Sequence, residues 1–123
     1  MEKFLIEGQD FIPHIAFDPD SGELEIGGNS FHEDTNGFYQ PALNWLKRYI
    51  AETYQPTTFS FRMSYFNTTT SKLFLQIVRL LEEYKGKVTI NWYYASDDDD
   101  MQEDGENLKA DTDLEFHLIA IEQ

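Results

Sequence analysis

The chain has 123 residues, of which 41% are hydrophobic and 15% aromatic, a composition that predicts a folded domain rather than a disordered segment. It carries 23 acidic and 9 basic side chains, and the formal charge of -14 disfavours nucleic acid and anionic membranes as partners. It has no cysteine, which excludes disulfides, thiolate metal sites and a cysteine nucleophile. We therefore expect residues 1–123 to form one domain.

The first seven residues contain only three consecutive apolar side chains. This run is too short for the core of a signal peptide or for a membrane span. A cytoplasmic location is the expectation that follows.

The first half of the chain predicts a hairpin followed by a helix. Two short strands, at 11–17 and 23–26, flank residues 18–22, whose proline, aspartates and glycine favour a tight turn. After a polar stretch at 27–30, a helix is expected over about 36–53, because apolar residues recur there with helical spacing. Its apolar stripe consists of Tyr39, Leu43, Leu46 and Ile50.

The second half predicts alternating strands and helices. Strict alternation of apolar and polar residues predicts a strand over 57–66, and an amphipathic pattern predicts a helix over about 69–85. A strand at 88–94 follows. The acidic segment 97–113 predicts a short helix, whose aspartates suit a helix N-terminus, before a last strand at 114–121.

This order predicts an α/β fold, a single STAS-like domain in which a mixed β-sheet is covered by helices. Strands joined through a single helix are expected to be parallel neighbours with right-handed crossovers. The succession is that of the STAS domains of anti-sigma-factor antagonists, an analogy of fold that assigns no function.

Four hydroxyl side chains follow one another where a predicted core strand ends and the amphipathic helix begins. They lie within a segment that we call the hydroxyl run, Asn67, Thr68, Thr69, Thr70, Ser71 and Lys72. One explanation is helix capping, for which a single Asn, Ser or Thr suffices. The other is a phosphoacceptor, because a phosphate here meets free backbone N–H groups and the positive end of the helix dipole. The two roles are compatible.

The acidic segment 97–106 invites comparison with a calcium-binding loop. With Asp100 at the first loop position Gly105 falls at the sixth, as an EF-hand requires. The ligand positions three, nine and twelve fit poorly, because they are occupied by Gln102, Leu108 and Asp111. A solvated loop or helix start is the simpler interpretation. An acidic cation-binding protein or a small enzyme using these carboxylates is the alternative class.

No enzyme motif is found. The histidines His14, His32 and His117 show no metal-ligand spacing, and the chain lacks a nucleophile elbow, a Walker loop and a dinucleotide fingerprint. We therefore expect no catalytic residues, no metal site, no cofactor and no enzymatic activity. A further alternative is a constitutive structural subunit, in which the hydroxyl run only caps a helix.

The run from Tyr65 to Lys72 resembles the signature of the SiaC family of bacterial regulatory phosphoproteins. Further segments resemble family blocks in the same order and spacing, namely 38–41, 45–46, 92–94 and 97–106. The resemblance spans about residues 8–121, and several separate blocks make it more specific than one short motif. The sequence departs from the family pattern at 31–34.

The resemblance implies a phosphorylation-controlled protein-binding switch. Thr68 matches the threonine that a partner kinase phosphorylates and a PP2C-type phosphatase restores. The remaining residues of the run, predicted to flank the phosphosite and to bind the partner, are Asn67, Thr69, Thr70, Ser71 and Lys72. Thr69 and Thr70 replace expected serines, so more than one acceptor stays open. In the best-known system of the family, the unphosphorylated protein binds and activates a diguanylate cyclase, which links the switch to cyclic-di-GMP and biofilm behaviour. A homologous switch can serve a different output.

Overall fold

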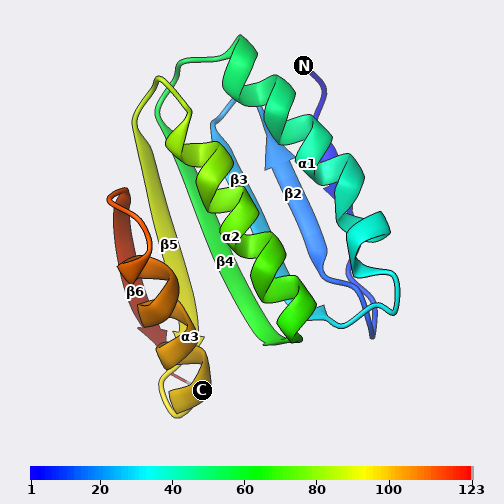
Figure 1. The fold of residues 1–123 in the computed structure, drawn as a ribbon, viewed down its shortest axis with the longest axis vertical. Helices are drawn as coiled ribbons and strands as arrows, with labels where there is room; N and C mark the ends of the chain where they lie inside the picture. Colours follow the sequence, from blue (N-terminus) through cyan, green and yellow to red (C-terminus); the bar gives the residue numbers. More distant parts are fainter. Residues whose placement is uncertain (123) are drawn as a thin grey trace.

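Six strands form one sheet, in which they follow one another in their order along the chain (Figure 1). The computed structural model describes residues 1–122. The strands are β1 (Phe4–Ile6), β2 (His14–Asp18), β3 (Glu23–Ser30), β4 (Thr57–Phe66), β5 (Val88–Ala95) and β6 (Glu115–Ile121). The helices are α1 (Thr35–Glu52), α2 (Thr68–Glu82) and α3 (Asp99–Ala110).

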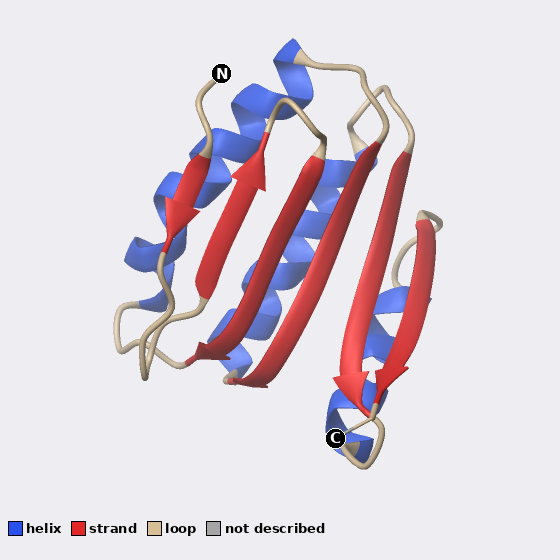
Figure 2. Cartoon of the chain, turned by 180° about the vertical axis from the view of Figure 1, so that it is seen from behind, coloured by secondary structure: helices blue, strands red, loops and turns tan. Residues whose placement is uncertain are grey.

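The sheet is mixed. Strands β1, β2 and β3 pair antiparallel, whereas β3, β4, β5 and β6 pair parallel. One helix connects each parallel pair, and each connection advances by one strand in the same direction. Because such crossovers are right-handed, all three helices are expected on the same face. Figure 2 shows the sheet from its other side, which none of the helices in residues 1–122 covers.

Alternation along β4 separates the two faces of the sheet. Phe59, Phe61 and Met63 are buried under the helices, while Arg62 and Ser64 are exposed on the other side. Phe61 also packs on a ring of α2, since its ring centroid lies 4.8 Å from that of Phe74. The aromatic core thereby fixes α2 on the sheet, and with it the residues at the start of α2.

The predicted fold class is confirmed: the sheet is mixed, helices cover it, and the strands joined through one helix are parallel neighbours. The covering is confined to one face. The short helix predicted within 97–113 is α3. Strand β1 was not expected, because a three-residue strand leaves almost no periodic pattern.

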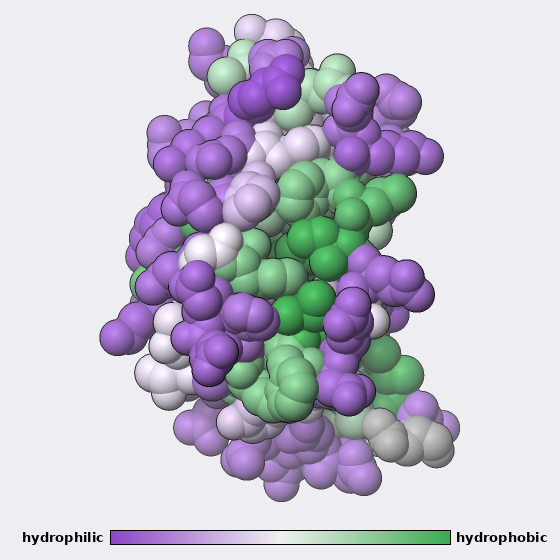
Figure 3. Space-filling model, turned by 90° about the vertical axis from the view of Figure 1, so that its right-hand side faces the viewer, coloured by the Kyte–Doolittle hydropathy of each residue, from purple (hydrophilic) through white to green (hydrophobic). Residues whose placement is uncertain are grey.

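Figure 3 shows the side of the molecule on which α1 and the edge strand β1 lie, where apolar side chains gather between polar ones. The large apolar side chain of Leu5, in β1, is exposed at this edge.

The bounds of the hairpin strands differ from those expected. The first strand begins at His14 rather than at residue 11, because Gln9 N–H donates to the carbonyl of Ile12 and closes a turn before Pro13. The second strand continues beyond residue 26 to Ser30, with a bulge between Gly28 and Asn29. Gly28 has a φ of 98°, a conformation that glycine adopts without strain. This extension brings Ser30 next to the start of α2.

Candidate functional site

The hydroxyl run lies at the carboxyl edge of the parallel strands, where β4 passes directly into α2. Strand β4 ends at Phe66, and Thr68 is the first residue of α2. Asn67 joins them, and its backbone N–H donates to the carbonyl of Ser30 at 3.1 Å. The end of β3 and the start of α2 are therefore held together by the backbone. Ligand sites of open α/β sheets are commonly found at this edge.

Asn67 caps α2. Its side-chain oxygen accepts hydrogen bonds from the backbone N–H of Thr70 at 2.9 Å and from the Thr70 hydroxyl at 2.8 Å. Its carbonyl also accepts from the backbone N–H of Ser71. One residue of the run thus supplies the cap, as helix-start chemistry allows. The hydroxyls of Thr68 and Thr69 are not needed for capping.

The four hydroxyls differ in their accessibility. Thr70 is 0% exposed, whereas Thr68, Thr69 and Ser71 are exposed. The Ser71 hydroxyl donates to the Thr68 carbonyl at 2.7 Å. Within residues 1–122, the hydroxyls of Thr68 and Thr69 form no hydrogen bond, so these two are the hydroxyls most open to a modifying enzyme.

A buried polar network lies under the site. The Thr70 hydroxyl shares a hydrogen bond with the Ser30 hydroxyl at 2.9 Å, and Ser30 shares another with the Tyr39 hydroxyl at 2.8 Å. Burial raises the pKa of Tyr39 to about 12, so its hydroxyl stays protonated. The network connects the start of α2 with β3 and α1. Sequence reasoning missed Ser30 and Tyr39, because they lie 40 and 31 residues away from Thr70 in the chain.

The start of α2 carries no acidic side chain in its first turn. Lys72 follows one turn after Thr68 and is exposed. Partial positive charge at a helix N-terminus favours an added anion, and a cation one turn further on favours it again. The local charges therefore suit a phosphate on Thr68.

Three aromatic rings form a row at the same edge. The ring centroid of Phe31 lies 5.2 Å from that of Phe11 and 5.5 Å from that of Tyr65. Phe11 and Tyr65 are 59% and 54% exposed. Exposed aromatic side chains next to each other are typical of protein-binding surfaces.

The acidic segment forms the N-cap and the first turn of α3. The side chain of Asp98 accepts from the backbone N–H of Met101 at 3.0 Å, and Asp99 and Asp100 lie in the first turn. Within residues 1–122, no group of three or more His, Cys, Asp or Glu side chains is arranged to hold a metal ion. Helix capping and the helix dipole account for these carboxylates.

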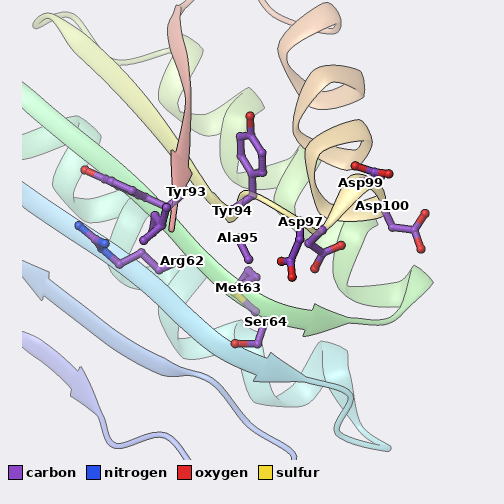
Figure 4. A pocket seen from close by; sticks show the side chains of 11 residues that line it. Arg62, Met63, Ser64, Tyr93, Tyr94, Ala95, Asp97, Asp99 and Asp100 are labelled. Carbon is purple, nitrogen blue, oxygen red and sulfur yellow. The ribbon is translucent and has the colours of Figure 1, made fainter. Parts of the chain in front are cut away.

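A cavity of about 730 Å³ opens between this segment and the uncovered face of the sheet. Arg62 and Tyr93 lie together at one end of it, and Asp99 and Asp100 at the other (Figure 4). The Arg62 guanidinium stacks 3.7 Å from the Tyr93 ring centroid and donates to Glu25 at 2.8 Å. The cation is thus already paired.

Each of the three histidines forms a local hydrogen bond. His14 bonds to Glu25 and His117 to Glu115, each at 2.8 Å, while His32 accepts from the backbone N–H of Asp34. Each imidazole has a local structural partner.

None of the helices within residues 1–122 has the length and apolar character of a membrane span.

By its fold the protein is a two-layer α/β domain in which helices cover one face of the sheet. A hydroxyl cluster lies at the carboxyl edge of the sheet, at the start of α2. The chain belongs to the SiaC family: the family model for SiaC family regulatory phosphoproteins matches residues 6–121. The family resemblance found in the sequence is confirmed. An uncharacterized protein of Pseudomonas aeruginosa strain UCBPP-PA14 is 28% identical to this chain in an alignment that covers 98% of each.

Solved structures of SiaC from Pseudomonas aeruginosa have the same fold. Apo-SiaC is 27% identical and superposes with a TM-score of 0.89, covering 98% of this chain and 100% of that one. A structure of the diguanylate cyclase SiaD in complex with its activator SiaC matches with a TM-score of 0.90 and 26% identity, covering 96% of this chain and 99% of the matched one. This chain is therefore a member of a regulatory family, one relative of which activates a cyclase.

Proposed function

We propose that this chain is a cytoplasmic, phosphorylation-controlled protein-binding switch without enzymatic activity, in which residues 1–123 act as one regulatory domain. A partner kinase phosphorylates Thr68, and a PP2C-type phosphatase removes the phosphate. The unphosphorylated form binds an output protein, for which a diguanylate cyclase is the leading candidate because a SiaC relative activates one. Cyclic-di-GMP signalling and biofilm formation are the expected consequences.

One observation carries the proposal. Thr68 presents an exposed hydroxyl at the start of α2, although a neighbouring residue already supplies the cap. A helix start that needs only Asn67 leaves the Thr68 hydroxyl free for another purpose. The first turn also lacks the acidic side chains that would repel a phosphate.

Phosphorylation would change the partner-binding surface directly. It adds about -1.5 to -2 charges and a tetrahedral group to the exposed edge that also carries Tyr65. An acidic partner is then repelled, and an uncharged one is blocked sterically. The remaining residues of the run have separate tasks in this proposal: Asn67 and Thr70 hold the helix start, while Thr69, Ser71 and Lys72 contact the partner.

The first test is phosphate mapping. Thr68→Ala is expected to abolish incorporation of phosphate in the native host, with phosphatases blocked during lysis. Thr69→Ala is the matched control, because Thr69 is also exposed and is expected to retain most of the incorporation. Intact-mass analysis and peptide mapping give the readout.

A phosphate found mainly on Thr69 or Ser71 would show that this residue, and not Thr68, is the phosphoacceptor. No phosphate under any growth condition would leave the hydroxyl run with a structural role alone. Thr70 is too buried for modification without local opening, so Thr70→Ser, which keeps the hydroxyl, is expected to leave incorporation unchanged.

A further inference from the structure

A groove of about 380 Å³ runs between α1 and α2 on the outer side of the molecule. Figure 1 shows the two helices side by side over the sheet. Apolar side chains of both helices line the groove, including Leu43, Leu75 and Leu80. Leu75 and Leu80 are only half-buried, so apolar surface remains open between the helices.

The charge of this groove is opposite to that of the whole chain. Its lining includes three basic side chains, Lys47, Lys72 and Arg79, and one acidic side chain, Glu83. The chain as a whole has a formal charge of -14. The groove is therefore a local cationic surface on an acidic protein.

Two of these cations form no salt bridge with the residues that the structure describes. Within residues 1–122, five of the nine basic residues form salt bridges with acidic residues. Arg79 is one of them, through Glu82. Lys47 and Lys72 are not, and they line the groove from α1 and from α2, respectively. Carboxylates of a partner would find both of them available.

We propose that the groove between α1 and α2 binds an acidic amphipathic helix of the output protein, which deepens the proposed function and rests on it. The apolar face of that helix packs against Leu75 and Leu80, and its carboxylates pair with Lys47 and Lys72. Amphipathic helices bind grooves of this kind by their apolar faces. A basic helix is disfavoured here, because it would bring cations against unpaired lysines.

The neighbouring groove between α2 and α3 does not suit this ligand. It is lined by Asp104 and Asp111, with Lys72 as its one basic residue, and it measures about 270 Å³. Two carboxylates on its wall would repel an acidic helix. The α1–α2 groove is the better match by charge.

The position of Thr68 connects this groove with the switch. Thr68 precedes Lys72 by four residues, so the two side chains are neighbours on the surface of α2. An anion placed four residues before a lysine is the favourable orientation for pairing. A phosphate on Thr68 therefore occupies Lys72 within the chain, and it also repels the carboxylates of the partner helix.

Two synthetic helical peptides test the groove. They share one leucine face and carry either glutamates or lysines on the remaining positions. The intact protein is expected to bind the acidic peptide and not the basic one, in fluorescence anisotropy titrations at low salt. Lys47→Gln with Lys72→Gln is expected to weaken binding at least about tenfold. The matched control, Lys85→Gln with Lys109→Gln, removes two lysines that form no salt bridge within residues 1–122 and do not line the groove, and it is expected to bind like the unchanged protein.

The proposal is overturned if the acidic peptide does not bind, if the basic peptide binds better, or if both double variants lose affinity equally. Amide chemical shifts must change along the facing sides of α1 and α2; changes confined to α3 or to the uncovered sheet face also overturn it. Protein carrying phosphothreonine at position 68 is expected to bind the acidic peptide at least about tenfold more weakly. Unchanged affinity of this form overturns the groove mechanism, whereas absence of phosphate in the host overturns the proposed function and leaves the groove intact.

Discussion

The starts of α2 and α3 lie at the same edge of the sheet and are capped in the same way, but only the start of α3 carries acidic side chains in its first turn. In each, an Asx side chain accepts from the backbone N–H three residues later: Asn67 from Thr70, and Asp98 from Met101. The first turn of α3 contains two acidic residues, and that of α2 contains none. The dipole of α3 is thus already compensated by its own carboxylates, whereas α2 leaves room for an added anion.

The two helices also differ in how they are held. The buried residues of α2 are Thr70, Leu73, Phe74, Ile77, Val78 and Leu81. Those of α3 are Met101, Gly105 and Leu108. A firmly anchored helix keeps its start in place when the charge there changes. The phosphorylation site proposed at Thr68 therefore lies on the more firmly anchored of the two helices, where the surface can change while the fold persists.

The largest expected effect tests this difference in anchoring. Phe74 is 1% exposed and packs against the rings of Phe61 and Trp92, so Phe74→Ala is expected to lower the free energy of unfolding by about 3–5 kcal/mol. Leu108 is 9% exposed, and Leu108→Ala is expected to cost about 2 kcal/mol, at the low end for a core leucine. Denaturant unfolding measures both. Equal losses would show that α3 is anchored as firmly as α2.

The sequence predicted those elements whose buried residues recur in a regular pattern. The apolar residues of α2 recur with helical spacing, so the helix and its buried face followed from the pattern. Strand β1 did not, because its three residues gain their order from pairing with β2. The end of β3 was also missed, since Gly27 and Gly28 suggest a loop when tertiary contacts are unknown. Gly27 pairs with His14 and Arg62 in the sheet, and glycine is required there because a side chain would collide with the imidazole of His14.

For the candidate site, the residue pattern predicted a helix start but did not separate its hydroxyls, and Thr68 was singled out by the family resemblance alone. The position between a strand and a helix identified residues 67–72 as a helix start. The burial of Thr70 depends on Ser30, which lies 40 residues earlier and meets it only in the folded sheet. No local pattern separates Thr70 from Thr68 and Thr69.

Replacing each capping residue with alanine compares the stability of the two helix starts directly. Asn67→Ala loses the acceptor for both the N–H and the hydroxyl of Thr70, so its cost is expected near the upper end of the usual range of about 0.5–2 kcal/mol. Asp98→Ala loses one hydrogen bond and removes one of several crowded negative charges, so it is expected near the lower end. Thermal unfolding gives the difference. Asn67→Asp is the control, because it keeps the acceptor oxygen.

A negative charge added at the start of α2 is expected to stabilise the fold. Thr68→Asp is expected to raise the free energy of unfolding by about 0.3–1 kcal/mol at low salt, because its carboxylate meets an uncompensated helix dipole. The neutral Thr68→Asn is the control for the change of shape. The gain should fade in high salt. A loss of stability with Thr68→Asp would contradict the view that the start of α2 accepts an anion.

The smallest expected effect is a pair of opposite pH dependences. Burial, and then the nearby charges of Asp100 and Glu103, raise the pKa of Asp104 on α3. A raised folded-state pKa means that ionisation destabilises the fold; this penalty is absent below the unfolded pKa of about 3.9 and grows as pH rises through the folded value. Asp104→Asn is therefore expected to raise Tm slightly at pH 7, with no gain at pH 3.

Glu82, the last residue of α2, provides the opposite case. A hydrogen bond from Thr112, aided by Arg79, lowers the pKa of its carboxyl. A lowered folded-state pKa gives stability that is present above the unfolded pKa and is lost as pH falls through the folded value. Glu82→Gln is therefore expected to lower Tm at pH 7 and to have a smaller effect at pH 3. Melting curves of both variants against the unchanged protein at the two pH values decide the matter. If the two substitutions shift Tm in the same direction at pH 7, the carboxylates of α3 are not more destabilising than that of α2. The proposed electrostatic difference between the two helices is then wrong.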